Sequence, residues 1–257
     1  MDFQLPNIEF GKNNSQIETI NVMSANLGTK MKTSRWVKKE LVKEDIDIAG
    51  FQETPNNLGD LITPQGWNSH CKKGLCLMSK FDFVYLEKES DLYSRSGYST
   101  FVSLYEIEIN GRKEKLLNVH LETPRKAYTG FSLKDMSLDS FYDNAIQRYI
   151  EAKKMSELMA KYNPAIVVGD FNMPKESAIY RENFSAYHNA FEERGFGFGY
   201  TKFTSLHGVR IDHILSSDTF YPIRAVVGSD VGSDHKPMIA TLSVRPYEIQ
   251  INQYAKL

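Results

Sequence analysis

Short segments in which apolar and polar residues alternate recur along the chain, and they are rich in β-branched residues. Residues 17–24 and 46–52 show this pattern, which is typical of half-buried β-strands. A helical stretch from Trp36 to Leu41 separates them, so the chain is predicted to open as strand, helix, strand. Further strands are expected at 75–79, 82–87, 100–109, 115–121, 165–169, 210–216, 223–228 and 237–244.

The clearest helix is predicted from about Asp139 to Tyr162, because its apolar residues recur at three- and four-residue spacing and so share one face. Pro164 ends this helix and leads into the strand Ala-Ile-Val-Val. The dipeptide Asn110-Gly111 is typical of a tight hairpin turn. Residues 123–138 are predicted to form a long mobile loop.

Many strands interrupted by a few helices predict two β-sheets packed face to face, with helices on the outer faces. The length of 257 residues suits one such domain over 1–257, with a core of about 17–245 that carries the motifs described below. Hydrophobic residues make up 41% of the chain and charged residues 25%, which is ordinary for a folded globular protein.

The charge balance argues against a long polyanion as a partner. Lys and Arg total 31 against 32 Asp and Glu, so the formal charge of −1 provides no bulk basic field. Cys71 and Cys76 are the only cysteines; they lack the partners of a zinc site and are too few for a disulfide framework, which fits a reduced compartment. Without a signal-peptide pattern or an 18-residue apolar run, we expect a cytoplasmic enzyme, and we expect a monomer.

Polar residues stand where many of the predicted strands begin or end, and each alone is usually a turn residue or a structural histidine. Together they are harder to dismiss, because strands of two packed sheets can bring their ends to one edge. Carboxylates gathered there would repel one another unless a hard cation lay between them, and oxygen ligands favour Mg²⁺ or Mn²⁺ over zinc. Such an ion typically serves a phosphate substrate. The residues are Asn26, Gln52, Glu53, His120, Asp170, Asn172, Asp212, Asp234 and His235.

The segments that carry these residues resemble the ordered motifs of the endonuclease/exonuclease/phosphatase superfamily. They are Ser-Ala-Asn-Leu-Gly, Phe-Gln-Glu-Thr, Asn-Val-His-Leu-Glu-Thr, Val-Gly-Asp-Phe-Asn, Arg-Ile-Asp-His-Ile-Leu and Gly-Ser-Asp-His-Lys-Pro. The superfamily includes pancreatic-type deoxyribonucleases, apurinic endonucleases, neutral sphingomyelinases and inositol polyphosphate 5-phosphatases. The resemblance implies a four-layer α/β/β/α sandwich with two mixed sheets, and Mg²⁺-dependent attack of water on a phosphate ester.

The resemblance also implies roles for single residues. Glu53 would be the principal metal ligand, with Asn26 contacting the metal or holding that carboxylate in place. Asp234 resembles a second carboxylate that binds the metal directly or through water. Asp170 and Asn172 match the pair that positions the attacking water and binds the phosphoryl oxygen.

His235 matches a histidine that is hydrogen-bonded to a carboxylate, here Asp212. Either Asp170 or His235 would take the proton from water. His120 distinguishes the chain from apurinic endonucleases, which have a tyrosine here, and it would bind the phosphate or protonate the leaving oxygen. Arg125 is either a surface arginine or a phosphate clamp, in a phrase similar to that of tyrosyl-DNA phosphodiesterases.

The aromatic segment Gly-Phe-Gly-Phe-Gly-Tyr-Thr-Lys-Phe over 195–203 belongs either to the core or to a substrate pocket beside the metal, where its rings stack on a base or on an apolar group. In this stretch the chain looks most like bacterial members of unassigned substrate. We expect a phosphoester hydrolase that slightly prefers a nucleic-acid phosphodiester in DNA or RNA. A phosphatase or phosphodiesterase for small or lipid-linked phosphates is the alternative, and an inactive binding module is the remote one.

Overall fold

The computed structural model describes residues 2–5, 18–28, 34–91, 94–95, 99–124, 138–203 and 207–244. The first of its two large sheets has the strand order β15-β16-β1-β2-β4-β3. Its strands are β1 (Thr19–Asn26), β2 (Ile48–Gln52), β3 (Asn68–Lys72), β4 (Leu75–Ser79), β15 (Phe220–Val227) and β16 (Met238–Val244).

The second large sheet has the order β11-β14-β10-β9-β8-β5, and two short strand pairs lie outside both sheets. Its strands are β5 (Phe83–Tyr85), β8 (Val102–Ile109), β9 (Arg112–His120), β10 (Ile166–Asp170), β11 (His188–Asn189) and β14 (Asp212–Ser216). The short pairs are β6 (Ser94–Arg95) with β7 (Ser99–Thr100), and β12 (Lys202–Phe203) with β13 (Gly208–Val209).

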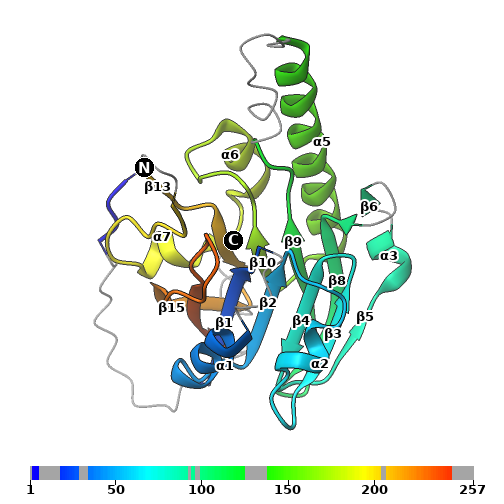
Figure 1. Cartoon of the computed structure of the whole chain (residues 1–257), viewed down its shortest axis with the longest axis vertical. Coiled ribbons are helices and arrows are strands. Elements are labelled where there is room, and N and C mark those ends of the chain that lie inside the picture. The colour runs from blue at the N-terminus through cyan, green and yellow to red at the C-terminus, as the bar shows by residue number, and fades with distance from the viewer. Residues whose placement is uncertain are drawn as a thin grey trace, which may run out of the picture.

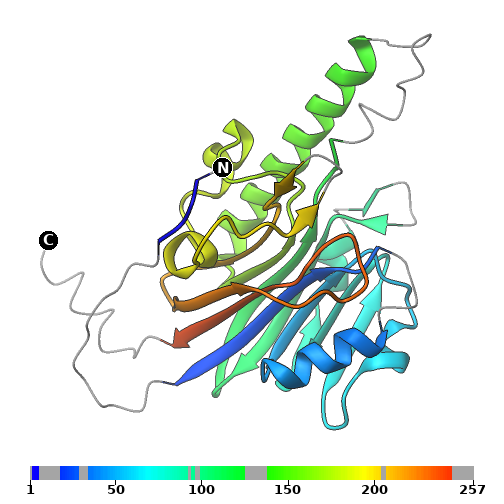
Figure 2. The ribbon, with the colours of Figure 1, turned by 60° about the vertical axis from the view of Figure 1, so that its left-hand side comes forward.

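Helices cover the outer faces of the two sheets, as Figures 1 and 2 show, except for the short helix Ala190–Arg194, which packs Ala190 and Phe191 into the apolar cluster between the sheets. Their bounds are α1 (Ser34–Lys43), α2 (Leu58–Ile62), α3 (Glu87–Asp91), α5 (Leu138–Tyr162), α6 (Ala178–Phe184) and α7 (Ala190–Arg194). None of the helices within the described ranges is both long enough and apolar enough to cross a membrane.

Three apolar clusters separate the four layers. Val22 and Ile48 of the first sheet pack with Val168 of the second in the cluster between the sheets. A second cluster joins the second sheet to α5 and α6, and a third joins the first sheet to α1 and α2. The predicted α/β/β/α sandwich is therefore confirmed.

The strand directions bring the predicted polar residues to one edge. β1 runs parallel to β2, and β9 runs parallel to β10, so Asn26 and Gln52 align in one sheet and His120 and Asp170 in the other. β14 runs antiparallel to β10, which places its first residue, Asp212, opposite Asp170. β16 likewise begins at this edge because it runs antiparallel to β1.

The predicted hairpin turn lies between β8 and β9. Asn110 and Gly111 have φ values of 54° and 75°, the positive angles that this tight turn requires. Gly169 is needed for a different reason, because a Cβ there would lie 2.1 Å from the carbonyl oxygen of Val119 in the neighbouring strand. That close approach sets the path of the chain just before Asp170.

Some elements are absent from the sequence interpretation. The sequence of β3, Asn-Ser-His-Cys-Lys, has no apolar alternation because β3 is a partly exposed edge strand. The helices α2, α3, α6 and α7 have only 5 to 7 residues, too few for a helical period to show. Most of the predicted loop 123–138 lies outside the described residues. Cys71 and Cys76 lie opposite each other on β3 and β4 and form a disulfide.

Candidate active site

One amide joins carboxylates from the two sheets. The Nδ2 of Asn26, at the end of β1, donates to Glu53 Oε1 and to Asp170 Oδ2, each at 3.0 Å. Its Oδ1 accepts a hydrogen bond from the backbone N–H of Gly28 at 3.0 Å, which fixes the orientation of the amide. Glu53 follows β2 with a φ of 53°, an uncommon angle for a residue with a side chain and one that clusters at functional sites.

His120 faces the same two carboxylates. Its Nε2 lies 3.6 Å from Glu53 Oε1 and 3.9 Å from Asp170 Oδ2. The side chains of His120 and Glu53 are 21% and 29% exposed, whereas that of Asp170 is only 1% exposed. His120 and Glu53 are therefore the members of this group that a ligand from solvent reaches first.

His235 and Asp212 form the predicted pair. The Nδ1 of His235 lies 2.8 Å from Asp212 Oδ2, and both side chains are buried. The other ring nitrogen, Nε2, lies 3.8 Å from Asp170 Oδ2. A chain of charged groups thus runs from Asp212 through His235 to Asp170.

Burial and the neighbouring charges set the protonation of this chain. Burial and the Asp212 carboxylate raise the pKa of Asp170 to about 7, although His235 opposes the shift. Burial by itself would lower the pKa of His235, but the Asp212 and Asp170 carboxylates raise this pKa to about 9. His235 is therefore cationic at neutral pH, and Asp170 is the member that titrates near neutrality.

Asn172 is held by three hydrogen bonds. Its backbone N–H donates to Asp170 Oδ1 at 2.8 Å, and its Nδ2 donates to the Leu121 carbonyl at 2.8 Å. Arg148 of α5 donates from Nη2 to the Asn172 carbonyl at 3.2 Å. The φ of Asn172 is 51°, so Asn172, like Glu53, is a predicted site residue with a left-handed backbone.

Asp234 lies beside the cluster and pairs with the ammonium group of Lys202. Lys202 is 8% exposed as a whole residue, whereas the Asp234 side chain is 53% exposed. An isolated backbone bridge joins Lys202 to His235, so this ion pair is attached directly to the site. Arg125, the predicted phosphate clamp, lies outside the described residues.

The donor set suits a hard divalent cation. Carboxylates of Glu53, Asp170 and Asp212 meet at one edge, and carboxylate oxygens are preferred ligands of Mg²⁺ and Mn²⁺. One ligand atom each from Asp170, Asp212 and His235 also lie within 4.8 Å of one another. That group is buried and its His235 Nδ1 is already bonded to Asp212, so the more exposed Glu53 is the better anchor for an incoming ion.

A buried amide pair joins the sheets below the site, and the sequence interpretation included its Gln52 but missed its Asn118. Gln52 Nε2 donates to Asn118 Oδ1 at 2.7 Å. Asn118 Nδ2 donates in turn to the carbonyl groups of Phe51 and Cys76, at 3.1 and 3.0 Å. Asn118 stands two residues before His120, and since alternate strand residues share a face, this spacing was the available signal.

His213 was also missed, and it supports the segment after Asn172. Its Nε2 donates to the Met173 carbonyl at 3.0 Å, and its Nδ1 accepts from Asn189 Nδ2 at 3.1 Å. Burial lowers the pKa of His213 to about 4, so the ring is neutral at physiological pH. No sequence signal distinguishes it from an ordinary core histidine.

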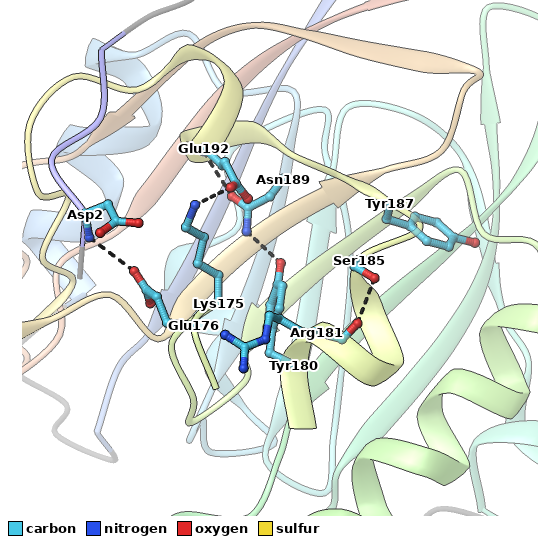
Figure 3. Close-up of a pocket in the computed structure, with 9 residues that line it drawn as sticks. All are labelled: Asp2, Lys175, Glu176, Tyr180, Arg181, Ser185, Tyr187, Asn189 and Glu192. Carbon is cyan, nitrogen blue, oxygen red and sulfur yellow. Dashed lines mark hydrogen bonds and ion pairs between the residues drawn. The ribbon is translucent and has the colours of Figure 1, made fainter. Parts of the chain in front are cut away.

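A cavity of about 400 Å³ lies elsewhere, beside α6 and α7. Figure 3 shows Lys175 reaching toward Glu192, and Asn189 Nδ2 donates to the Tyr180 hydroxyl at 2.7 Å. The residues that line it include none of the carboxylates and histidines described above. Its polar groups largely bind one another, and the cavity is separate from the site.

Comparisons with known proteins agree with this geometry. The sequence model of the endonuclease/exonuclease/phosphatase family matches residues 19–235. None of the curated proteins matches the chain significantly by sequence.

Solved structures share its fold at low identity. A Bacteroides thetaiotaomicron protein of the endonuclease/exonuclease/phosphatase family is 17% identical, with a TM-score of 0.60, over 90% of this chain and 100% of that one. A 3′–5′ exonuclease from Neisseria meningitidis is 16% identical, with a TM-score of 0.60, over 86% and 98% of the chains. TDP2 from D. rerio, complexed with a single-strand DNA product, is 16% identical, with a TM-score of 0.61, over 87% and 98%.

Proposed function

Because the chain belongs to the endonuclease/exonuclease/phosphatase family, whose members are metal-dependent phosphoesterases, we propose that it is an Mg²⁺- or Mn²⁺-dependent hydrolase of a phosphodiester in nucleic acid. The observation that carries the proposal is the shared amide of Asn26, which holds Glu53 and Asp170 from different sheets at 3.0 Å each. A polar cluster that only stabilises the fold does not require solvent access, whereas Glu53 and His120 are both partly exposed, as binding of a metal and a substrate requires.

The ion would be held by Glu53, with Asp234 as a second carboxylate, and Asn26 would orient Glu53 through its Nδ2. When bound, the cation supplies positive charge that stabilises the phosphoryl oxygens in the transition state. Asp234 is already paired with Lys202, so Asp234 would act at the margin of the ion through water.

Asp170 would take the proton from the attacking water. A group with a pKa of about 7 is suited to accept a proton near neutral pH, whereas His235, with a pKa of about 9, already carries one. The His235 imidazolium would then stabilise the negative charge that develops on the phosphoryl group. Asp212 keeps the ring oriented through its bond to Nδ1.

Asn172 and His120 would contact the substrate. The second hydrogen of the Asn172 amide would be donated to a phosphoryl oxygen while the first remains on the Leu121 carbonyl. His120 faces Glu53 and Asp170 from the more exposed side, where it would bind the phosphate or protonate the leaving oxygen. Arg125 stays a predicted phosphate clamp.

The preference for nucleic acid is supported by two structural neighbours, one a 3′–5′ exonuclease and one bound to a DNA product. The formal charge of −1 instead favours the second candidate, a phosphatase or phosphodiesterase for a small or lipid-linked phosphate. An inactive module is disfavoured, because every motif position carries a residue competent for the reaction.

A substrate panel tests the proposal. The protein, with Mg²⁺ or Mn²⁺, would be assayed on duplex DNA, single-stranded DNA, RNA, phosphotyrosyl-DNA, inositol phosphates, sphingomyelin and bis(p-nitrophenyl) phosphate. We expect metal-dependent cleavage of the polynucleotides. Cleavage of inositol phosphates or sphingomyelin alone would select the second candidate, and full activity in excess EDTA would exclude both.

The cytoplasmic location and the monomeric state stay predictions. The disulfide between Cys71 and Cys76 conflicts with the expected reduced compartment, because cytosolic thiols are normally kept reduced. Alkylation of free thiols during cell lysis, followed by mass spectrometry, would decide between two thiols and a bridge. Light scattering after size-exclusion chromatography would give the oligomeric state.

A further inference from the structure

Five aromatic side chains, four from residues 196–203 and one from residue 3, form a continuous surface beside β12. Among them Phe196 is 70% exposed, Phe3 50%, Phe203 49% and Phe198 43%. Exposed rings this numerous in one place are unusual on a monomer and mark sites of interaction. We call Phe3, Phe196, Phe198, Tyr200 and Phe203 the aromatic surface.

The rings form a connected series of contacts. Phe198 and Tyr200 are stacked with centroids 5.2 Å apart and planes 11° from parallel, and Tyr200 meets Phe203 edge to face at 6.2 Å. Phe3 meets Phe196 and Phe198 at 5.4 and 5.3 Å. Hydrogen bonds between the backbones of Gln4 and Gly197 hold Phe3 against the segment that carries the other rings, so the arrangement of the rings is fixed by the fold.

The aromatic surface is joined rigidly to the active site. Thr201, the next residue after Tyr200, accepts hydrogen bonds at its hydroxyl from the backbone N–H groups of Ile211 and Asp212, each at 3.2 Å. Its carbonyl accepts from the N–H of Lys236 at 2.7 Å, directly beside His235. The segment that carries the rings is therefore fixed to the strand that begins at Asp212 and to the residue that follows His235.

A cation accompanies the rings. The ammonium group of Lys236 lies 4.9 Å from the centroid of Phe203, whereas the neighbouring Lys202 is buried and paired with Asp234. Rings that stack on bases, together with cations that follow the phosphates, are the combination that binds single-stranded nucleic acid without reading its sequence. The bases of a duplex are already paired and stacked on each other, so a duplex leaves few base faces on which these protein rings can stack.

We propose that the aromatic surface binds unpaired nucleotides and selects single-stranded nucleic acid for the phosphodiesterase site, an inference that rests on the proposed function. Stacking also reconciles a polynucleotide substrate with the formal charge of −1, because it does not require a long basic track. Binding should accordingly depend less on salt than binding that rests on many phosphate contacts.

The test measures the binding of a fluorescein-labelled 12-residue oligothymidylate and of a hairpin duplex by anisotropy, in EDTA to prevent cleavage. The double variant Phe196→Ala/Phe198→Ala should bind the single strand about tenfold more weakly or worse, the scale of one lost base stack. Phe198→Trp, which keeps a ring, should bind as the wild type does. The matched control is Trp36→Ala on α1, which removes a ring that is 51% exposed and has Lys39 at 6.0 Å but lies away from the aromatic surface, on the helix that covers the first sheet.

A loss shared equally by the single strand and the duplex, or no loss, would overturn the proposal. So would loss of binding to anionic phospholipid vesicles with unchanged oligonucleotide binding, or loss of self-association alone. Metal-dependent hydrolysis of bis(p-nitrophenyl) phosphate by the wild type separates the two failures. If that hydrolysis occurs without single-strand binding, only this inference fails; if no phosphodiester is hydrolysed, the proposed function fails.

Discussion

The Oδ2 of Asp170 lies 3.8 Å from the Nε2 of His235, although Asp170 ends a strand of one sheet and His235 precedes a strand of the other. The two sheets thus meet at the catalytic edge through opposite charges. Because Asp212 bonds the far side of the same ring, the imidazolium lies between two carboxylates. This arrangement explains why His235 keeps its proton despite burial.

A substitution that removes either carboxylate should lower the pKa of His235, which is about 9 in the metal-free protein. We expect a larger decrease for Asp212→Asn than for Asp170→Asn, because Asp212 contributes both a charge and a hydrogen bond. NMR titration of the ring nitrogens measures the shift, with the signals of His188 as an internal reference. A larger effect from Asp170 would mean that the bond between Asp212 and His235 is not formed in solution.

Asp212 and His235 should also behave as one unit in kinetics. Asp212→Asn should reduce kcat nearly as much as His235→Ala, and the double variant should resemble the worse single variant. Steady-state kinetics of the four proteins in Mg²⁺ provide the cycle. Losses that multiply would assign Asp212 a separate task, such as direct contact with the metal.

Glu53→Gln should weaken metal binding while leaving the fold intact, because glutamine keeps the shape of the side chain and can still accept from Asn26. Calorimetric titration with Mn²⁺ should show the loss, and activity should be abolished. Glu108→Gln is the matched control, since Glu108 is exposed on β8 of the second sheet, near the end opposite to His120. Unchanged Mn²⁺ affinity in Glu53→Gln would indicate that the metal binds instead at the group of Asp170, Asp212 and His235.

Much of this arrangement could be predicted from the sequence, because strand ends and motif spacing are local features. Glu53, His120 and Asp170 all stand directly after or at the ends of apolar runs, so their meeting at one edge follows from the topology. The positions of Lys202 and His213 could not be predicted, since each depends on contacts with residues distant in the chain. The exposure of Phe196 was likewise hidden, because a glycine-rich aromatic segment fits a core as well as a surface.

His213 should make the protein sensitive to acid. Its folded pKa of about 4 lies below the usual 6.5 or so, so the unfolded chain binds more protons between these values and stability is lost as the pH falls from 6.5 toward 4. This group alone should remove about 2 kcal/mol of unfolding free energy between pH 7.5 and 5. Urea unfolding of wild type and His213→Gln at both values should show a shallower decrease in the variant; equal decreases would show that the ring is not buried neutral.

The His120 prediction concerns the leaving group. His120 lies on the exposed side of the cluster, 3.6 Å from Glu53 and 3.9 Å from Asp170, where it can reach an oxygen that departs toward solvent. If His120 protonates that oxygen, His120→Ala should reduce kcat by a factor on the order of 10² or more on an unactivated phosphodiester. A nitrophenyl ester should lose much less, because its departing oxygen needs no proton.

Kinetics of wild type and His120→Ala on both substrates separate the possible roles, with His188→Gln on the distant strand β11 as the matched histidine control. Equal losses on the two substrates would assign His120 to phosphate binding, because a binding contact does not distinguish between leaving groups. No loss on either would leave His120 as a structural residue at the end of β9. The argument that separates this protein from apurinic endonucleases, which have a tyrosine at this position, would then fail.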